Sequence, residues 1–138
     1  APEIEIINRP YEDDSYDAED VVFYQTKNGE LTLPLDGICT DKGTSYVFAL
    51  DVDILGKYAV MLSAKSDLSA TAQSPVTLFT TGFPSAVFTF NGTNGAWNEI
   101  EHPVNMYSRF LVCRLYFGGS GLTLKEIRFK LIGELPNL

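Results

Sequence analysis

The chain of 138 residues is long enough for one domain with a single buried core, and its 45% hydrophobic and 12% aromatic content argues against intrinsic disorder. Its 18 acidic and 10 basic residues give a net charge of −8, which argues against a nucleic-acid partner because phosphate binding needs clustered lysines and arginines. No apolar run reaches the roughly 18 residues of a membrane span and no signal peptide is visible, so we expect a soluble domain with no membrane partner.

The amino-terminal part is the most acidic segment. Residues 12–20, EDDSYDAED, carry six carboxylates and no base. Runs of like charge are typical of solvated leaders or linkers, so we assign residues 1–19 to a leader or linker with a possible first strand, and residues 20–138 to one module. The alternative is a calcium site, because crowded hard oxygen donors suit that ion, although no twelve-residue EF-hand register is present.

From residue 21 onward, apolar and polar residues alternate, as in strands with one buried face. In the three clearest segments the apolar residues that share a face are Tyr46, Phe48, Leu50 and Val52 in 45–52, Tyr58, Val60, Leu62 and Ala64 in 57–65, and Leu111, Cys113, Leu115 and Phe117 in 109–117. Further strands are expected at 21–25, 31–35, 75–80, 86–90, 99–106 and 122–131. In the last of these the apolar phase slips between Leu124 and Ile127, which predicts a β-bulge.

Glycine and asparagine separate these segments, in KNGE, DILGK, FNGTNGA and FGGSG, and this composition is typical of turns. No stretch has a convincing helical period. About nine strands at short spacing predict an all-β fold, an antiparallel two-sheet β-sandwich or jelly roll.

Catalytic chemistry is not recognisable in this pattern. His102, the only histidine, precedes Pro103 and lacks a partner at nucleophile–base spacing, so we interpret it as an ordinary strand residue. Cys39 and Cys113 do not have zinc-ligand spacing, and either a disulfide between them or a free buried thiol at Cys113 is possible. Nothing positions the two facing carboxylates of a glycosidase, although 18 acids leave that alternative open.

Three stretches together resemble a known family. They are YVFALDVDILGKYAVML at 46–62, NGAWNEIEHPVNM at 94–106 and FLVCRLYFGGSGLTLKEIRF at 110–129. In order and spacing they resemble the galactose-binding-like jelly rolls that serve as carbohydrate-binding modules, especially family six and its relatives. The resemblance extends over roughly residues 45–131 and implies a sandwich that binds sugar through its loops.

In modules of this kind the tryptophan of a Gly-x-Trp loop stacks on a sugar ring, and Trp97 occupies the matching place. The physical reason is independent of the family, because the C–H face of a pyranose lies flat on an indole and the preceding Asn94-Gly95 pair can turn the loop to present it. Ile100 stands where a second tryptophan often follows. The alternative is that Trp97 fills the edge of the core.

Polar and aromatic neighbours complete the expected sugar site. Asn91, Asn94 and Asn98 are candidates for hydrogen bonds to sugar hydroxyls. The resemblance implies a second aromatic that faces the tryptophan across the ligand, for which Tyr24 and Tyr46 are candidates. We assign Tyr46 to the core because it shares its phase with Phe48, which leaves Tyr24.

The resemblance also implies a structural calcium ion. The family's amino-terminal Ala-Glu motif is matched by Ala18-Glu19, so Glu19 and Asp20 are the candidate ligands. The last strand of such modules commonly has Asn and then, two residues later, an Asp that faces the metal, where this chain has Thr123 and Lys125. A lysine cannot ligate calcium, which puts that usual site in doubt.

The leading expectation is a non-catalytic, monomeric carbohydrate-binding module. It would be secreted within a multidomain polysaccharide-degrading enzyme and would bind a plant or microbial polysaccharide, concentrating the covalently linked catalytic domain at its substrate. The alternative is a structural or protein-interaction β-sandwich, as an accessory domain of a larger enzyme or a surface adhesin. A small β-sandwich enzyme is the third candidate.

Overall fold

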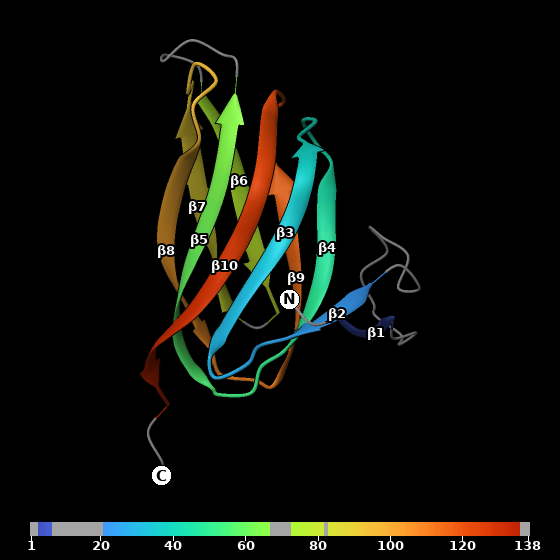
Figure 1. Ribbon diagram of the computed structural model, residues 1–138, viewed down its shortest axis with the longest axis vertical. Coiled ribbons are helices and arrows are strands. Elements are labelled where there is room, and N and C mark those ends of the chain that lie inside the picture. The colour runs from blue at the N-terminus through green and yellow to red at the C-terminus, as the bar shows by residue number, and fades with distance from the viewer. Residues whose placement is uncertain (1–2, 7–20, 67–72, 82, 136–138) are drawn as a thin grey trace.

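The computed structural model describes residues 3–6, 21–66, 73–81 and 83–135, which form two β-sheets packed face to face (Figure 1). The strands are β1 (Glu3–Ile6), β2 (Val22–Gln25), β3 (Glu30–Cys39), β4 (Ser45–Asp51), β5 (Gly56–Ser66), β6 (Gln73–Thr80), β7 (Phe83–Asn91), β8 (Asn98–Met106), β9 (Phe110–Phe117) and β10 (Leu122–Glu134). All nine segments predicted from alternation are strands, so the all-β sandwich is confirmed. Within the described ranges there is no helix that could span a membrane.

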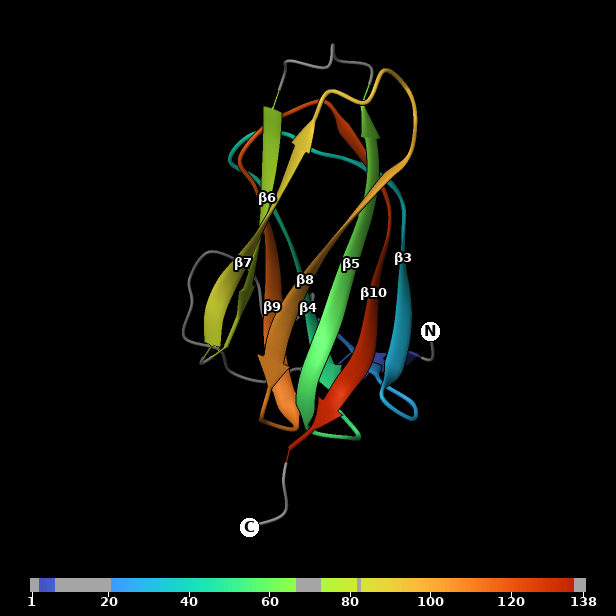
Figure 2. The same cartoon turned by 90° about the vertical axis from the view of Figure 1, so that its left-hand side faces the viewer.

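One sheet has six strands in the order β1-β2-β4-β9-β6-β7, and the other has four in the order β3-β10-β5-β8. Figure 2 shows the two layers from the side, with β7 and β8 at neighbouring edges. Neighbouring strands are antiparallel, with one exception that the sequence did not predict: β2 runs parallel to β4. The chain passes from β2 into β3 of the other sheet before it returns in β4, so these two strands are not joined by a hairpin.

The inward face of each strand supplies the core, as the alternation predicted. Phe48, Leu50 and Val52 of the β4 region are buried, and the rings of Phe48 and Phe129 meet edge to face across the two sheets with centroids 6.2 Å apart. Tyr46 packs against this core with its ring centroid 5.8 Å from that of Phe48, as expected. Because full burial of one such side chain contributes about 1.5–3 kcal/mol, this interlayer core is the main source of stability.

The predicted bulge is present in β10. Its register shifts between Leu124 and Glu126 against both β3 and β5. Leu124 and Ile127 are both buried, so the extra residue leaves Lys125 and Glu126 consecutively outside the core. The bulge therefore changes which side chains the four-stranded sheet displays on its outer face.

Of the four prolines within described strands, three lie in edge strands, and the fourth, Pro75, lies in the inner strand β6. Pro34 is in β3, Pro84 in β7 and Pro103 in β8, and these three strands are sheet edges. An edge strand has one side that needs no amide donor, so a proline is tolerated there.

The two cysteines lie in different sheets and are both free. Cys113 of β9 is buried, as its phase predicted, whereas Cys39 at the end of β3 is exposed. The disulfide alternative is therefore wrong.

Candidate functional site

The loop between β7 and β8, residues 92–97, passes from the six-stranded sheet to the four-stranded sheet at the upper end of the molecule (Figures 1 and 2). Thr93 and Ser66 fix this loop to the end of β5. The Ser66 amide donates to the Thr93 hydroxyl at 2.7 Å, and that hydroxyl donates to the Ser66 carbonyl at 2.9 Å. The Thr93 amide in turn donates to the Ser66 hydroxyl at 3.2 Å. Both residues are buried, so the loop begins from a rigid point.

A tight turn follows immediately. Asn94 and Gly95 have positive φ values of 55° and 82°, and the Ala96 amide donates to the Thr93 carbonyl at 3.1 Å. The Gly95 amide donates to the Ser66 carbonyl at 2.6 Å. Asparagine and glycine are the residues that adopt this left-handed conformation most readily. The turn that the Asn-Gly pair predicted is thus present, directly before Trp97.

Trp97 is displayed on the surface and is not a core residue. Its side chain is 46% exposed, whereas the buried aromatic residues of the core are at most a few per cent exposed. The alternative that Trp97 fills the edge of the core is therefore wrong. The position of the Asn-Gly turn explains this, because the chain enters β8 only at Asn98, one residue after the tryptophan.

Two lysines lie over the indole ring. The Nζ atom of Lys65 is 4.7 Å from the ring centroid of Trp97, and that of Lys125 is 5.8 Å away. Both distances are within the range of cation–π contacts. Lys65 follows the inward-facing Ala64 in β5, and Lys125 lies at the bulge of β10, so the contacts join these two strands to the loop residue that precedes β8, at one end of the four-stranded sheet. We call Trp97, Lys65 and Lys125 the Trp–Lys cluster.

Sequence reasoning missed the two lysines as members of the site. In the sequence, Lys125 stands out only as a residue that cannot bind calcium, and Lys65 only as part of an alternating strand. The only sequence signal for Lys125 is the phase slip after Leu124, which predicts a β-bulge and so a break in the alternation of inward and outward side chains at this residue. No sequence pattern predicts that Lys65, thirty-two positions before Trp97 in the printed sequence, lies against its ring.

The predicted asparagines surround the same loop. Asn91 ends β7, Asn94 is in the turn and Asn98 begins β8, and all three are exposed. They supply amide donors and acceptors at the end of the sandwich that carries Trp97. Their role in sugar binding stays a prediction.

Tyr24 is not part of this arrangement. It lies in β2, where it pairs with Glu3 and with Leu50 near the end of β4, and its partly buried side chain packs against the core. Figure 1 shows β2 at the lower part of the molecule, away from the β7–β8 loop. The structure therefore does not bring Tyr24 opposite Trp97, because the topology places β2 beside the far end of β4.

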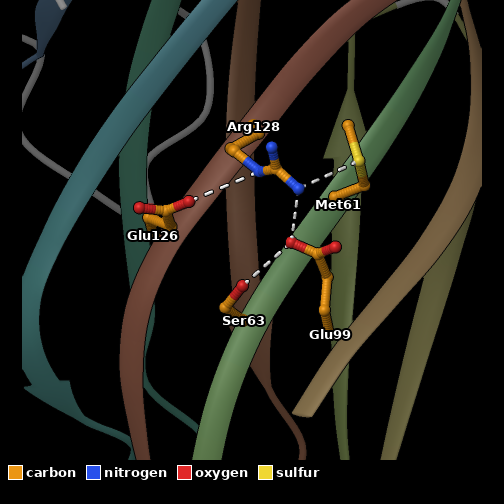
Figure 3. Close-up of polar contacts among 5 residues, drawn as sticks. All are labelled: Met61, Ser63, Glu99, Glu126 and Arg128. Atoms are coloured by element: carbon orange, nitrogen blue, oxygen red, sulfur yellow. Dashed lines mark hydrogen bonds and ion pairs between the residues drawn. The ribbon is translucent and has the colours of Figure 1, made fainter. Parts of the chain in front are cut away.

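A second polar cluster lies on the outer face of the four-stranded sheet. Figure 3 shows Arg128 of β10 between Glu99 of β8 and Glu126, with Met61 and Ser63 of β5 beside them. The Nη2 atom of Arg128 is 2.7 Å from Glu99 Oε2 and its Nε atom is 3.4 Å from Glu126 Oε2. The hydrogen bond and charge of Glu99 hold the pKa of Arg128 above its ordinary value.

This cluster does not resemble a glycosidase acid–base pair. Both carboxylates contact the same guanidinium, and they lie on an open sheet face and not in a cleft. The cluster is best explained as an ion pair that joins β8 and β10 across β5.

The metal prediction concerns residues outside the described ranges, where Glu19 and Asp20 lie. At the other expected position, the ammonium group of Lys125 lies over the ring of Trp97, and an ammonium group cannot ligate calcium. Among the residues that the structure describes, no group of three or more His, Cys, Asp or Glu side chains is arranged to hold a metal ion. Calcium therefore stays a prediction that depends on Glu19 and Asp20.

Two further places, the side chain of His102 and a pocket near it, contain groups that could take part in chemistry. The His102 ring meets Phe88 edge to face with centroids 5.0 Å apart, which agrees with an ordinary packing role. A pocket of about 270 Å³ lies where β5 begins and β8 ends, and its lining residues are Lys57, Pro84, Ser85, Pro103, Val104 and Asn105. The lining contains a serine and a lysine, but among the described residues no hydrogen bond joins Ser85 to Lys57, so the pocket does not show an activated nucleophile.

No protein-family model matches the chain. A β-glucosidase from Ruminococcus albus is 38% identical over 132 residues, which cover 94% of this chain and 14% of that enzyme. The chain thus spans only a small part of the length of that relative.

Solved structures with the same architecture include enzymes and isolated modules. A β-glucosidase from Paenibacillus barengoltzii superposes with a TM-score of 0.61 at 16% identity, over 79% of this chain and 11% of that one. The carbohydrate-binding module CBM6cm-2 of Cellvibrio mixtus lichenase 5A, solved with cellotriose, superposes with a TM-score of 0.57 at 19% identity. The match covers 76% of this chain and 88% of that module. The chain therefore shares the β-sandwich fold of these structures, which is the kind of fold that the sequence resemblance implied.

Proposed function

We propose that this chain is a non-catalytic carbohydrate-binding module that binds a plant or microbial polysaccharide through Trp97. The observation that carries the proposal is the display of this tryptophan on a rigid turn in a fold shared with such modules. An indole that is 46% exposed offers apolar area to the C–H face of a pyranose, and Asn94 and Asn98 flank it with amide groups.

The likeness to one part of a β-glucosidase supports an accessory role within a longer polypeptide, which we propose is secreted. A module tethered to a catalytic domain raises the effective concentration of that domain at the polysaccharide without any new contact at the active site. In this proposal the module acts as a monomer, and its two partners are the polysaccharide and the linked catalytic domain.

Affinity gel electrophoresis against a panel of soluble polysaccharides tests the proposal. Retention of the wild-type chain by at least one polymer is expected, and Trp97→Ala should abolish it, since stacking on one aromatic ring contributes on the order of 1–3 kcal/mol in related ring–aromatic contacts. Phe79→Ala is a matched control, because Phe79 is 40% exposed on the six-stranded sheet. Normal retention of a folded Trp97→Ala variant would reject the role of Trp97.

A second candidate function, a protein-interaction domain, is favoured by one observation. The outer face of the six-stranded sheet exposes Phe79, Val87 and Tyr116, with the Arg114 guanidinium carbon 4.9 Å from the Phe79 ring centroid and 5.9 Å from that of Tyr116. Grouped exposed aromatic residues often mark contact surfaces. A Phe79→Ser/Tyr116→Ser variant that disrupted domain packing in the parent polypeptide would support this alternative.

We also propose that Glu19 and Asp20 contribute to a structural calcium site, as the sequence predicted. An ion that binds only the folded state stabilises it by mass action, so chelation should lower the melting temperature. Glu19→Gln/Asp20→Asn should remove the effect of the chelator. An unchanged melting curve in excess chelator, with calcium shown to be absent, would remove the metal from the proposal.

A further inference from the structure

Resting on the proposed function, we infer that the Trp–Lys cluster selects an acidic sugar, a pyranose ring whose carboxylate is bound by Lys65 and Lys125 while the ring stacks on Trp97. The inference extends the proposed function by naming the class of sugar. It depends on where the two ammonium groups lie, at 4.7 Å and 5.8 Å from the indole centroid.

The two lysines have no anionic partner in the part of the chain that the structure describes. The ion pairs there join Arg109 to Asp51, and Arg128 to Glu99 and Glu126. Glu99 and Glu126 share the outer sheet face with the lysines, but the guanidinium of Arg128 occupies them (Figure 3). In a chain with net charge −8, two ammonium groups that contact only an aromatic ring are an uncommon concentration of available positive charge.

The position of the lysines distinguishes between neutral and acidic sugars. A neutral pyranose that stacks on the occupied ring face must displace an ammonium group from a favourable cation–π contact, and it offers only hydroxyl groups in return. A uronic acid offers a carboxylate, which forms a charge-assisted hydrogen bond with the displaced ammonium. Because the carboxylate of a uronate projects from the edge of the ring, stacking on Trp97 would bring it beside Lys65 and Lys125.

The bulge in β10 is the structural cause of this arrangement. Without the register shift between Leu124 and Glu126, strict alternation would not leave consecutive side chains outside the core. With the shift, Glu126 turns to Arg128 while Lys125 reaches Trp97. The same irregularity therefore places Lys125 in the Trp–Lys cluster and the following residue, Glu126, in the ion pair with Arg128.

Titration calorimetry with matched polymers tests the inference. Glucuronoxylan and polygalacturonate are each compared with their carboxyl-reduced derivatives, which keep the linkage but replace the carboxylate with a primary alcohol. We expect at least one acidic polymer to bind the wild-type chain about tenfold more tightly than its reduced form, since each exposed charge pair contributes up to about fivefold. This preference should decrease at about 0.5 M salt, where screening is strong.

The variants identify the groups responsible. Lys65→Gln/Lys125→Gln should lose the preference for the acidic polymer while keeping its binding to the reduced polymer. The matched control is Lys57→Gln/Lys130→Gln, which removes two charges from exposed positions farther along the same strands, β5 and β10. The control should keep the preference, because those lysines make no contact with Trp97.

Each remaining outcome contradicts a different statement. Equal binding of acidic and reduced polymers that still requires Trp97 would overturn the acidic-sugar inference and leave the proposed function intact. Binding to none of the polymers would count against both. A preference that survives in Lys65→Gln/Lys125→Gln, or equal affinity for a sulfated polymer without carboxylates such as carrageenan, would show that the cluster does not recognise a sugar carboxylate.

Discussion

The side chain of Thr93 and the backbone of Ser66 are joined by two hydrogen bonds, because the hydroxyl accepts from the Ser66 amide at 2.7 Å and donates to its carbonyl at 2.9 Å. This pairing continues the hydrogen bonding of β5 beyond Ala64, the last residue of β5 that pairs with β8. It is also the fixed point from which the Asn94-Gly95 turn presents Trp97.

Thr93→Val keeps the shape of the side chain and removes both hydrogen bonds. Because it leaves the buried Ser66 amide unpaired, while the Ser66 carbonyl keeps the hydrogen bond from the Gly95 amide, we expect a loss of about 1–3 kcal/mol in the free energy of unfolding. Urea denaturation measures the loss, and polysaccharide binding should weaken as the loop loses its anchor. Thr89→Val, at an exposed position of β7, is the control and should change neither property.

Trp97→Ala should lower the free energy of unfolding by about 1 kcal/mol or less, because the exposed ring loses only surface contacts with the two lysines. Phe48→Ala, at a fully buried core position, should cost about 3–5 kcal/mol. Thermal or urea unfolding of both variants distinguishes a displayed residue from a core residue. Equal losses in the two variants would contradict the display of Trp97.

Asp53 fixes the β2–β3 turn to the connection between β4 and β5. Its carboxylate accepts hydrogen bonds from the Thr26 hydroxyl at 2.7 Å, the Asn28 amide at 2.6 Å and the Gly29 amide at 3.2 Å. Burial raises the pKa of Asp53, but these bonds outweigh burial and hold the pKa below its ordinary value of 3.8.

A lowered pKa means that Asp53 stabilises the fold above pH 3.8, and that this contribution is lost as the pH falls through the folded-state pKa. Asp53→Asn should therefore be less stable than the wild type at pH 7, and the difference should shrink in acid. Urea midpoints measured from pH 7 down to about pH 2 give the profile. Glu101→Gln, at an exposed position of β8, serves as the control. A difference independent of pH would argue against a role for the charge.

The two free thiols should differ in reactivity. Burial raises the pKa of Cys113 to about 12, so its thiolate is scarce and inaccessible in the native protein, whereas Cys39 is exposed. A thiol reagent should label one cysteine in the native chain and both after denaturation. Cys39→Ser should abolish the native reaction, and rapid native labelling of Cys113 would indicate that the sandwich opens readily.

The sequence by itself determined the strands, their buried faces and the bulge. Period-two alternation records which side of each strand meets the core, so Phe48, Leu50 and Cys113 were predictable as buried residues. The slip after Leu124 likewise appears in the local pattern. The Asn94-Gly95 turn was predictable because left-handed backbone conformations favour these two residue types.

Only the tertiary structure decided which distant residues meet. Alternation does not specify strand order, so the sequence could not place β2 parallel to β4, and Tyr24 could be proposed for a site at the opposite end of the sandwich. The lysines lie over Trp97 because β5, β8 and β10 are neighbours in one sheet, which is a long-range pairing without a local signal. The exposure of Trp97 had the same cause, since an aromatic residue in a loop is buried or displayed according to what the rest of the chain brings to it.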